Sequence, residues 1–384
     1  MTELLYYRDA TLLEFSATVR SVEPAEGGYR VLLDRSAFFP CEGGQGADHG
    51  TLGGVAVTDV LLCGDELVHV TAEPLLVGTA VPGRVDAARR RRHMQVHTGE
   101  HILSGVLCRM YGATNVGFHL GDTEVTLDLD VFLDAAQLAA AEEEANRAVF
   151  ENRAVRILYP ASEDLPTLNY RSKLELTENV RLVEIEGVDL CACCAPHVAR
   201  TGEVGLIKII SSMRYKGGVR LHIAVGVDAL SDYRARCESV HAASVALSAP
   251  ESEIAPAIDR VLMALTEEKH AVSALRAALR AERLAAASAA AGGGDLYLSY
   301  PDLDPIGLRS YAEEGMAMTD GLVLVAAPAD GGCRYALASR TENVKKVAAG
   351  LHEALGGRGG GRPELVQGSV PVDFATLLSY FGRA

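Results

Sequence analysis

The sequence predicts a multidomain α+β protein, and three features of its 384 residues support this prediction. The N-terminal part alternates apolar and polar residues between glycine-rich turns, as half-buried strands do. The middle mixes such strands with alanine- and glutamate-rich stretches of helical periodicity. Residues 258–279 carry apolar side chains at intervals of three and four, which is typical of an extended helix. A chain of this length can form roughly two to four domains, each with its own core.

Composition and charge exclude several functional classes. With 48% hydrophobic and 23% charged residues, no run approaches the roughly 20 apolar residues that a membrane span needs, so no membrane partner is expected. The N-terminus lacks a basic-then-apolar signal pattern, which predicts a cytoplasmic location. The formal net charge of −15 argues against general coating of nucleic acid. Any RNA contact is therefore expected from local basic patches.

The eight cysteines do not suggest a disulfide framework in a chain of this length. Three of them fall within residues 191–194, which favours metal or thiol chemistry in a reducing compartment. A redox pair or simple packing is the alternative for this cluster.

Residues 1–83 are expected to form a small β-barrel domain from strands near 17–22, 29–33, 55–57 and 67–70. The loop over residues 38–50 contains two adjacent glycines, which allow close approach of the backbone to a ligand or a neighbouring domain. Gln45 follows them, and its amide can both donate and accept hydrogen bonds, so it is a candidate substrate-binding residue. The alternative is a tight turn with solvated polar residues.

Residues 84–240 contain two pairs of metal-capable side chains, His97 with His101 and Cys193 with His197. Members of each pair are four positions apart, which on a helix places them on one face. A helix is predicted over residues 95–110, ended by Gly112. Together the pairs supply three imidazoles and a thiolate, a set suited to tetrahedral zinc. Cys191 and Cys194 leave the choice of sulfur open, and Cys193 is preferred for its register with His197.

The rest of this segment reads as an α+β layer. Strands are expected at 124–130, 155–158, 180–185 and 206–210, with a helix over 133–152 and a hairpin turn at 216–218 leading into 219–225. Four consecutive arginines precede the first histidine pair: Arg89, Arg90, Arg91 and Arg92. They are candidates for phosphate contact in RNA, and a solvated helix face is the equal alternative.

Residues 241–294 are expected to form a helical arm and linker, either a helical hairpin or coiled coil, or a helix packed on its own domain. Residues 295–384 are expected to form a further α/β domain with a strand at 321–326 and a helix at 343–355. A glycine-rich segment then carries Arg358 and Arg362, which can present charge and backbone N–H groups to phosphate. A flexible loop is the alternative.

Four ordered motifs give the chain a family resemblance. HTGEHILSG, NVGFHLGDTEVTLDLD, the cysteine–histidine pair and TGEVGLIKI resemble the editing domain of alanyl-tRNA synthetases and of its free-standing relatives, the AlaX proteins. The loop from Glu42 to Gln45 resembles their N-terminal barrel, and the glycine-rich segment resembles the closing DHHA1 domain. The resemblance implies the long form of a trans-editing hydrolase. No class II aminoacylation core is recognisable, so the chain is not expected to charge tRNA.

That family hydrolyses the ester of tRNA(Ala) mischarged with serine or glycine, with Zn²⁺ held by the two pairs. By position, the resemblance implies that His97, His101, Cys193 and His197 are both the zinc ligands and the catalytic residues. It also suggests a polar residue after the first helix that recognises the serine hydroxyl, with Thr114 and His119 as candidates. One departure is Cys194-Ala195-Pro196 in place of the family's Gly-Gly-Thr. A homodimer through the C-terminal region is a further hypothesis.

Two rival functions stay open at this point. His97 to His101 also matches the H-x-x-E-H motif of inverted zinc peptidases, with Glu100 as base. That interpretation leaves Cys193 and His197 without a role. The other rival is a zinc module that binds tRNA without catalysis.

Overall fold

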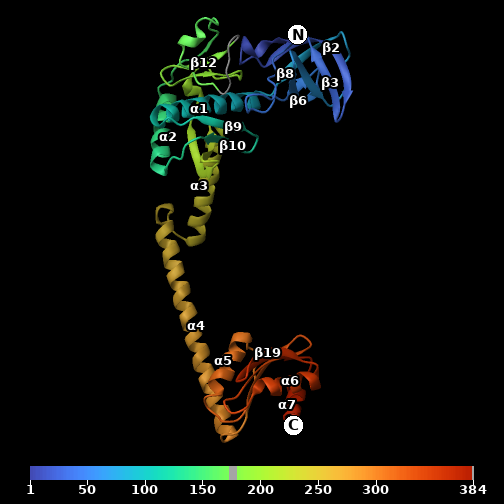
Figure 1. The fold of residues 1–384 in the computed structure, drawn as a ribbon, viewed down its shortest axis with the longest axis vertical. Helices are drawn as coiled ribbons and strands as arrows, with labels where there is room; N and C mark the ends of the chain where they lie inside the picture. Colours follow the sequence, from blue (N-terminus) through green and yellow to red (C-terminus); the bar gives the residue numbers. More distant parts are fainter. Residues whose placement is uncertain (173–179, 383–384) are drawn as a thin grey trace. The chain divides into compact units, whose positions relative to one another are not determined.

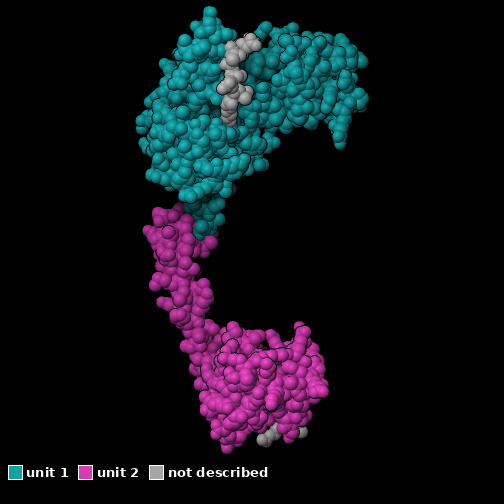
Figure 2. Space-filling model, in the orientation of Figure 1, with its two compact units in different colours: residues 1–243 teal, residues 244–384 magenta. Residues whose placement is uncertain are grey.

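The computed structural model describes residues 1–172 and 180–382, which divide into two compact units, residues 1–243 and 244–384 (Figure 2). The mixed α+β, multidomain class is confirmed, with seven α-helices and several separate sheets among the described residues (Figure 1). None of the described helices combines the length and the apolar character needed to cross a membrane.

The first unit begins with six strands that close into a barrel in the order β2-β3-β7-β6-β5-β8. Their bounds are β2 Glu14–Ala25, β3 Gly28–Leu33, β5 Gly50–Leu52, β6 Val55–Cys63, β7 Glu66–Thr71 and β8 Ala80–Val85. Two further short strands, β1 Glu3–Leu4 and β4 Arg35–Ser36, pair in parallel beside it. Val31, Leu33, Val60 and Leu67 fill the interior and are fully buried, because alternate residues of each strand point inward.

The barrel leads into a helix packed on a four-stranded sheet of order β14-β15-β10-β9 (Figure 1). The helix is α1, Ala87–Tyr111, and the strands are β9 Asn115–Leu120, β10 Val125–Leu129, β14 Ile207–Tyr215 and β15 Gly218–Val225. Ile102, Leu103, Val106 and Leu107 of α1 share one core with the sheet and with α2, Ala135–Phe150. This apolar stripe at helical spacing fixes which side of α1 faces the sheet.

A smaller antiparallel sheet, β11-β12-β13, joins the same unit and carries the chain toward the cysteine cluster. Its strands are β11 Val155–Leu158, β12 Leu182–Ile185 and β13 Asp189–Ala192. Helix α3, Val227–Leu247, then leaves β15 and spans the boundary between the two units.

The second unit contains the long helix α4, Ile254–Ala291, and a five-stranded sheet of order β16-β17-β18-β20-β19. One face of the sheet packs against α5 and the end of α4, and the other against α6 and α7 (Figure 1). The elements are β16 Leu296–Ser299, α5 Pro305–Gly315, β17 Val323–Ala329, β18 Gly332–Ala338, α6 Val344–Leu355, β19 Arg358–Arg362, β20 Leu365–Val370 and α7 Phe374–Tyr380.

Three local predictions need correction. Helix α1 begins at Ala87, so the four arginines belong to the helix itself. Cys193 and His197 lie in an irregular segment after β13. Pro196 disfavours helical backbone at the residue before it, Ala195, so this segment does not form a helix. The glycine-rich segment at Arg358 is strand β19, paired with β20, and not a flexible loop. Its glycines allow this pairing, since a Cβ at Gly359 would lie 2.3 Å from the carbonyl oxygen of Gln367.

Candidate metal centre

The four predicted ligands meet at one point in the first unit. One ligand atom from each of His97, His101, Cys193 and His197 lies within 4.8 Å of the others. Sγ of Cys193 is 3.5 Å from Nε2 of His97 and 3.4 Å from Nε2 of His197. The three histidines are at most 5% exposed. Three imidazoles and one thiolate around a small buried space fit tetrahedral zinc.

Helix α1 supplies the first pair by its own geometry. His97 and His101 are one turn apart, and their ring centroids are separated by 5.5 Å. The carboxylate of Asp86 accepts hydrogen bonds from two of the free N–H groups in the first turn of the helix, at Ala88 and Arg89. Gly112 ends the helix in the left-handed conformation, at φ 65°. Both ends of the helix that carries the pair are therefore fixed.

The second pair is positioned by packing on the barrel core. Ala195, between Cys193 and His197, is fully buried among the apolar residues of the barrel. The loop over residues 38–50 also reaches the site, because a Cβ on Gly43 would lie 3.8 Å from the His97 ring. Gly44 has φ 81°, and a Cβ there would lie 2.4 Å from the carbonyl oxygen of Phe118. Only glycine fits that approach.

Each histidine has a partner for its outer ring nitrogen, Nδ1. The Nδ1 atom of His97 lies 3.0 Å from Oε1 of Gln45, and that of His197 lies 3.0 Å from Oγ1 of Thr98. The Nδ1 atom of His101 is 3.2 Å from Oδ2 of Asp189, an electrostatic contact without good hydrogen-bond alignment. With Nδ1 occupied in this way, Nε2 of each ring is the nitrogen available to a metal.

Asp189 is itself held by Arg171. The guanidinium donates from Nε and Nη2 to the two carboxylate oxygens, both at 2.7 Å. Burial raises the pKa of Asp189, but Arg171 and His101 outweigh burial and lower it to about 2. The carboxylate therefore stays ionised and can orient the His101 ring at any ordinary pH.

The electrostatics of the cluster favour the metal-binding ionisation state at Cys193 and His197, but favour the protonated state at His101. Burial raises the pKa of the Cys193 thiol, but His97 and His197 outweigh burial and hold it well below its usual value. Burial lowers the pKa of His197 to about 3, so this imidazole is neutral. Burial also lowers the pKa of His101, but Asp189 and Cys193 outweigh it and hold the pKa well above its usual value. A metal would displace that one proton on binding.

A buried carboxylate borders the cluster. Oε1 of Glu100 accepts hydrogen bonds from Nδ2 of Asn115, at 2.7 Å, and from the hydroxyl of Ser104. Its other oxygen lies 3.9 Å from Nε2 of His101. Glu100 is thus fixed at the edge of the site by α1 and β9.

Of the other predicted site residues, Gln45 lies at the cluster and the rest lie outside it. Gln45 is at the cluster, on the His97 ring, but Thr114 and His119 are exposed and lie outside the four-residue cluster. The residue after Thr114, Asn115, is the one that turns inward to Glu100. Arg358 and Arg362 are exposed on β19, and Arg362 pairs with Glu364 at 3.5 Å.

The arginine cluster is corrected by the structure. Arg90 is 1% exposed and forms a buried ion pair with Asp48, so it cannot reach an RNA phosphate. Arg89 pairs with Asp122 at 2.5 Å and Arg92 with Asp228 at 2.8 Å, and both side chains are mostly buried. Arg91 alone of the four is exposed. Facing different neighbours around one helix, the four cannot act as a single basic patch.

Sequence reasoning missed Thr98, Asn115, Asp189 and Arg171. Thr98 stands inside the first motif and Asp189 just before the cysteines, and this nearness to metal-capable residues was a usable signal for both. Arg171 had no such signal, because its contact with Asp189 depends on the pairing of separate segments.

The fold and the site define an α+β protein with a small barrel and a buried cluster of three histidines and a cysteine that is able to hold a metal. The family described as "Threonyl and Alanyl tRNA synthetase second additional domain" matches residues 180–222. The alanyl-tRNA editing protein AlaX-M of Methanosarcina mazei is 39% identical over 233 residues, which cover 54% of this chain and 90% of that protein. The chain therefore belongs to the family of alanyl-tRNA editing proteins.

A longer relative is the alanine–tRNA ligase of Ignicoccus hospitalis, 31% identical over 378 residues. The match covers 94% of this chain but only 40% of the ligase. Among solved structures, the C-Ala domain of the Aquifex aeolicus alanyl-tRNA synthetase is 24% identical over 22% of this chain and 86% of that one. Its TM-score of 0.20 is too low to establish a shared fold, so the DHHA1-like domain stays a prediction.

Proposed function

We propose that this chain is a trans-editing hydrolase that removes serine, and also glycine, from mischarged tRNA(Ala). The observation that carries the proposal is the convergence of one ring nitrogen from each of three histidines and the Sγ of Cys193 at a largely buried cluster. Membership of a family that includes AlaX-M supports the substrate class. Zinc is the proposed cofactor, because the donor set suits it.

His97, His101, Cys193 and His197 would hold the zinc ion, which when bound supplies a Lewis acid for the ester carbonyl or its attacking water. The residues around it perform the positioning. Gln45, Thr98 and Asp189 orient the three rings through Nδ1. The loop that carries Gln45 and Gly43 contacts His97, which is 3% exposed.

The test is hydrolysis of Ser-tRNA(Ala), Gly-tRNA(Ala) and Ala-tRNA(Ala), with zinc content measured on the same samples. The wild-type protein should hydrolyse the first two and leave Ala-tRNA(Ala) largely intact. Cys193→Ala should lose zinc and at least about 100-fold in rate, because loss of a mere hydrogen-bond partner of a metal ligand already costs about 10–100-fold. Cys194→Ala is the matched control, because Cys194 lies outside the four-residue cluster. An inactive wild-type protein that still binds tRNA would point to the non-catalytic module.

The peptidase alternative gives a different result with Glu100→Gln. The amide oxygen can still accept from Asn115 and Ser104, so the fold should survive. We expect deacylation of the mischarged tRNA to remain within about threefold of the wild-type rate, whereas a peptidase that used Glu100 as base would lose its activity.

A further inference from the structure

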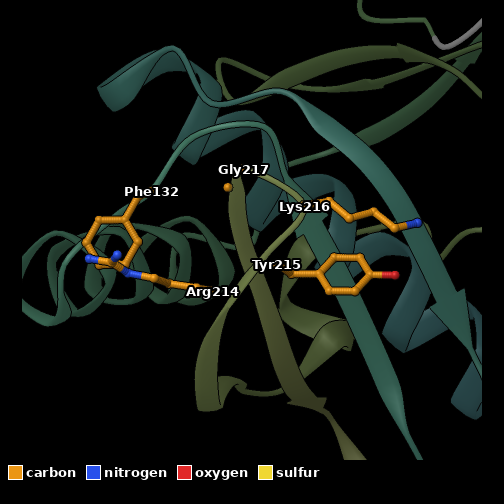
Figure 3. Close-up of a pocket in the computed structure, with 6 residues that line it drawn as sticks. Phe132, Arg214, Tyr215, Lys216 and Gly217 are labelled. Atoms are coloured by element: carbon orange, nitrogen blue, oxygen red, sulfur yellow. The ribbon is translucent and has the colours of Figure 1, made fainter.

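The tip of the β14–β15 hairpin combines positive charge with aromatic rings outside the metal centre (Figure 3). A depression of about 390 Å³ is lined there by Phe132, Arg214, Tyr215, Lys216, Gly217 and Gly218. Two of these residues are cationic and none is acidic, in a chain whose formal net charge is −15. A local reversal of sign of this kind marks a surface for an anionic partner.

The guanidinium of Arg214 lies over the exposed ring of Phe132. Its Cζ lies 4.7 Å from the ring centroid of Phe132, which is 52% exposed although it is apolar (Figure 3). Contact with a ring occupies the face of a guanidinium and leaves N–H groups at its edge for a second partner. Among the described residues no carboxylate pairs with Arg214, so that edge is open to an incoming anion.

Lys216 stands at the turn itself, where φ is 44° at Lys216 and 88° at Gly217, as two-residue hairpin turns require. Its Nζ is 5.0 Å from the ring centroid of Tyr215. Arg220 lies over the same ring at 3.8 Å, but its charge is balanced by Asp128 at 2.6 Å. Arg220 therefore fixes Tyr215, while Arg214 and Lys216 supply the unbalanced charge.

We propose that this hairpin tip binds phosphate groups of an RNA backbone through Arg214 and Lys216. The inference rests on the proposed function, in which the RNA is tRNA. The fork of Arg214 can bind one phosphate with two N–H groups, and Lys216 adds a mobile point charge. Arg89, Arg90 and Arg92, by contrast, are each paired with a carboxylate.

The experiment compares tRNA binding by the full-length wild-type chain and by the double variant R214A/K216A over a range of salt concentrations. The matched control is R147A/R156A, which removes the same charge from exposed arginines of the same unit that pair with glutamates. The hairpin variant should bind tRNA about tenfold more weakly at 0.1 M salt. The slope of the logarithm of the binding constant against the logarithm of the salt concentration should be smaller in magnitude by about 2, or about 1 for each lost phosphate contact. The control should change neither quantity comparably.

The contact between Arg214 and the ring of Phe132 is tested separately. Phe132→Leu keeps both cations, so we expect a rise in Kd of roughly threefold with the salt slope preserved, and Phe132→Tyr should restore wild-type binding. Circular dichroism and Tm verify folding of every variant. Unchanged tRNA binding in the folded double variant, or an equal loss in the control, overturns the proposal.

Two further binding measurements distinguish an RNA phosphate from a free phosphate ion and from a phospholipid headgroup. Inorganic phosphate and anionic phospholipid vesicles are titrated against the same proteins. Binding of either that is lost in R214A/K216A while tRNA affinity is unchanged would identify a small-anion or membrane site and overturn the RNA proposal. Failure of the proposed function is distinguishable, because a wild-type chain without deacylase activity can still show hairpin-dependent tRNA binding.

Discussion

At the scale of single residues, the clearest finding is the difference between Arg90 and Arg91. Two adjacent arginines in one charge run have opposite roles, since one is buried beside Asp48 and the other faces solvent. Arg90 also donates to the carbonyl oxygens of Ala10, at 2.8 Å, and Ala37, at 2.5 Å. All its donors point to the barrel side of the unit.

Arg90→Ala should therefore lower the free energy of unfolding by roughly 3–5 kcal/mol, because it leaves the Asp48 carboxylate buried without its partner. Arg91→Ala should change it by less than about 0.5 kcal/mol, as an exposed position does. Urea denaturation of the two variants measures the difference. Equal stability of the two variants would contradict the buried ion pair.

His69 gives a pH-dependent prediction in the barrel. It is fully buried, its Nε2 lies 2.8 Å from Oγ of Ser36, and burial lowers its pKa to about 4. The unfolded chain, with an ordinary histidine pKa of about 6.5, binds a proton that the folded state excludes between these two values. Stability from this residue is complete above about pH 6.5 and falls as the pH drops toward 4.

Between pH 7 and 4.5 the fall from His69 amounts to about 2–3 kcal/mol. In His69→Gln, which keeps a donor and an acceptor but does not titrate, the free energy of unfolding should fall less over this range. Parallel pH slopes of the variant and the wild type, measured by urea denaturation, would contradict the assignment.

At the scale of elements, helix α1 is the structural centre of the site, and two glycines let other elements approach it. A Cβ at Gly99 would lie 2.6 Å from Val225, and one at Gly105 would lie 2.7 Å from Cβ of Asp189 and 2.8 Å from the carbonyl oxygen of Val188. Gly105 thus admits Asp189 to the helix surface, one turn from His101. A glycine in a helix is normally a weakness of up to about 1 kcal/mol, and here it permits the contact.

Gly105→Ala should destabilise the first unit by about 1–3 kcal/mol despite the better helix propensity of alanine, because backbone as well as side-chain atoms obstruct the new methyl group. It should also weaken zinc binding, since Asp189 would move away from His101. Chelator competition measures the zinc affinity, and urea denaturation measures stability.

The control is Leu107→Ala in the same helix, where the side chain is fully buried in the core. It should cost about 2–5 kcal/mol of stability with little change in zinc affinity. If both variants lost zinc equally, the effect would follow from general destabilisation and not from Asp189.

The same elements explain what the sequence could predict. The histidine pair was accessible because its spacing coincides with one helical turn, and the apolar stripe from Ile102 to Leu107 identified the helix. The pair of Cys193 and His197 was identified by a helical argument that is wrong, since Pro196 prevents a helix there. Their closeness to α1 depends on Ala195 packing in the barrel, a long-range contact that no local pattern encodes.

The roles of polar residues were harder to predict than their presence. Gln45 was correctly identified as notable, but its observed partner is the His97 ring, and its assignment to substrate binding stays a prediction. Thr114 and His119 stay predictions for substrate binding, and the sequence did not single out Asn115, because the inward face of a strand follows from its pairing with β10 and the irregularity near Asp128. Adjacent residues of a strand point to opposite faces, so the inward position cannot be read from the sequence without the pairing.

At the scale of the whole molecule, the division at residues 243 and 244 has a functional consequence. All four candidate ligands and their Nδ1 partners belong to the first unit. The match to AlaX-M likewise covers only 54% of this chain, while it covers 90% of that protein. The first unit is therefore expected to hold the metal independently.

A fragment of residues 1–247, which keeps α3 complete, should fold cooperatively, bind one zinc ion and retain deacylation of Ser-tRNA(Ala) at saturating tRNA. The complementary fragment should bind no zinc at this affinity. Calorimetry, zinc analysis and single-turnover deacylation measure these outcomes. A fragment 1–247 that is unfolded or free of zinc would show that the site depends on the second unit.

The buried contact of Arg90 with Asp48 also constrains how such a chain can be rearranged. Its guanidinium comes from α1, which follows β8, and the carboxylate that neutralises it comes from the loop before β5, so the pair spans the junction between the barrel and the helix. A recombination event at that junction, in nature or in a chimera, would bring together halves that were never matched in charge. The barrel and helix α1 should therefore be kept together when segments of such chains are exchanged.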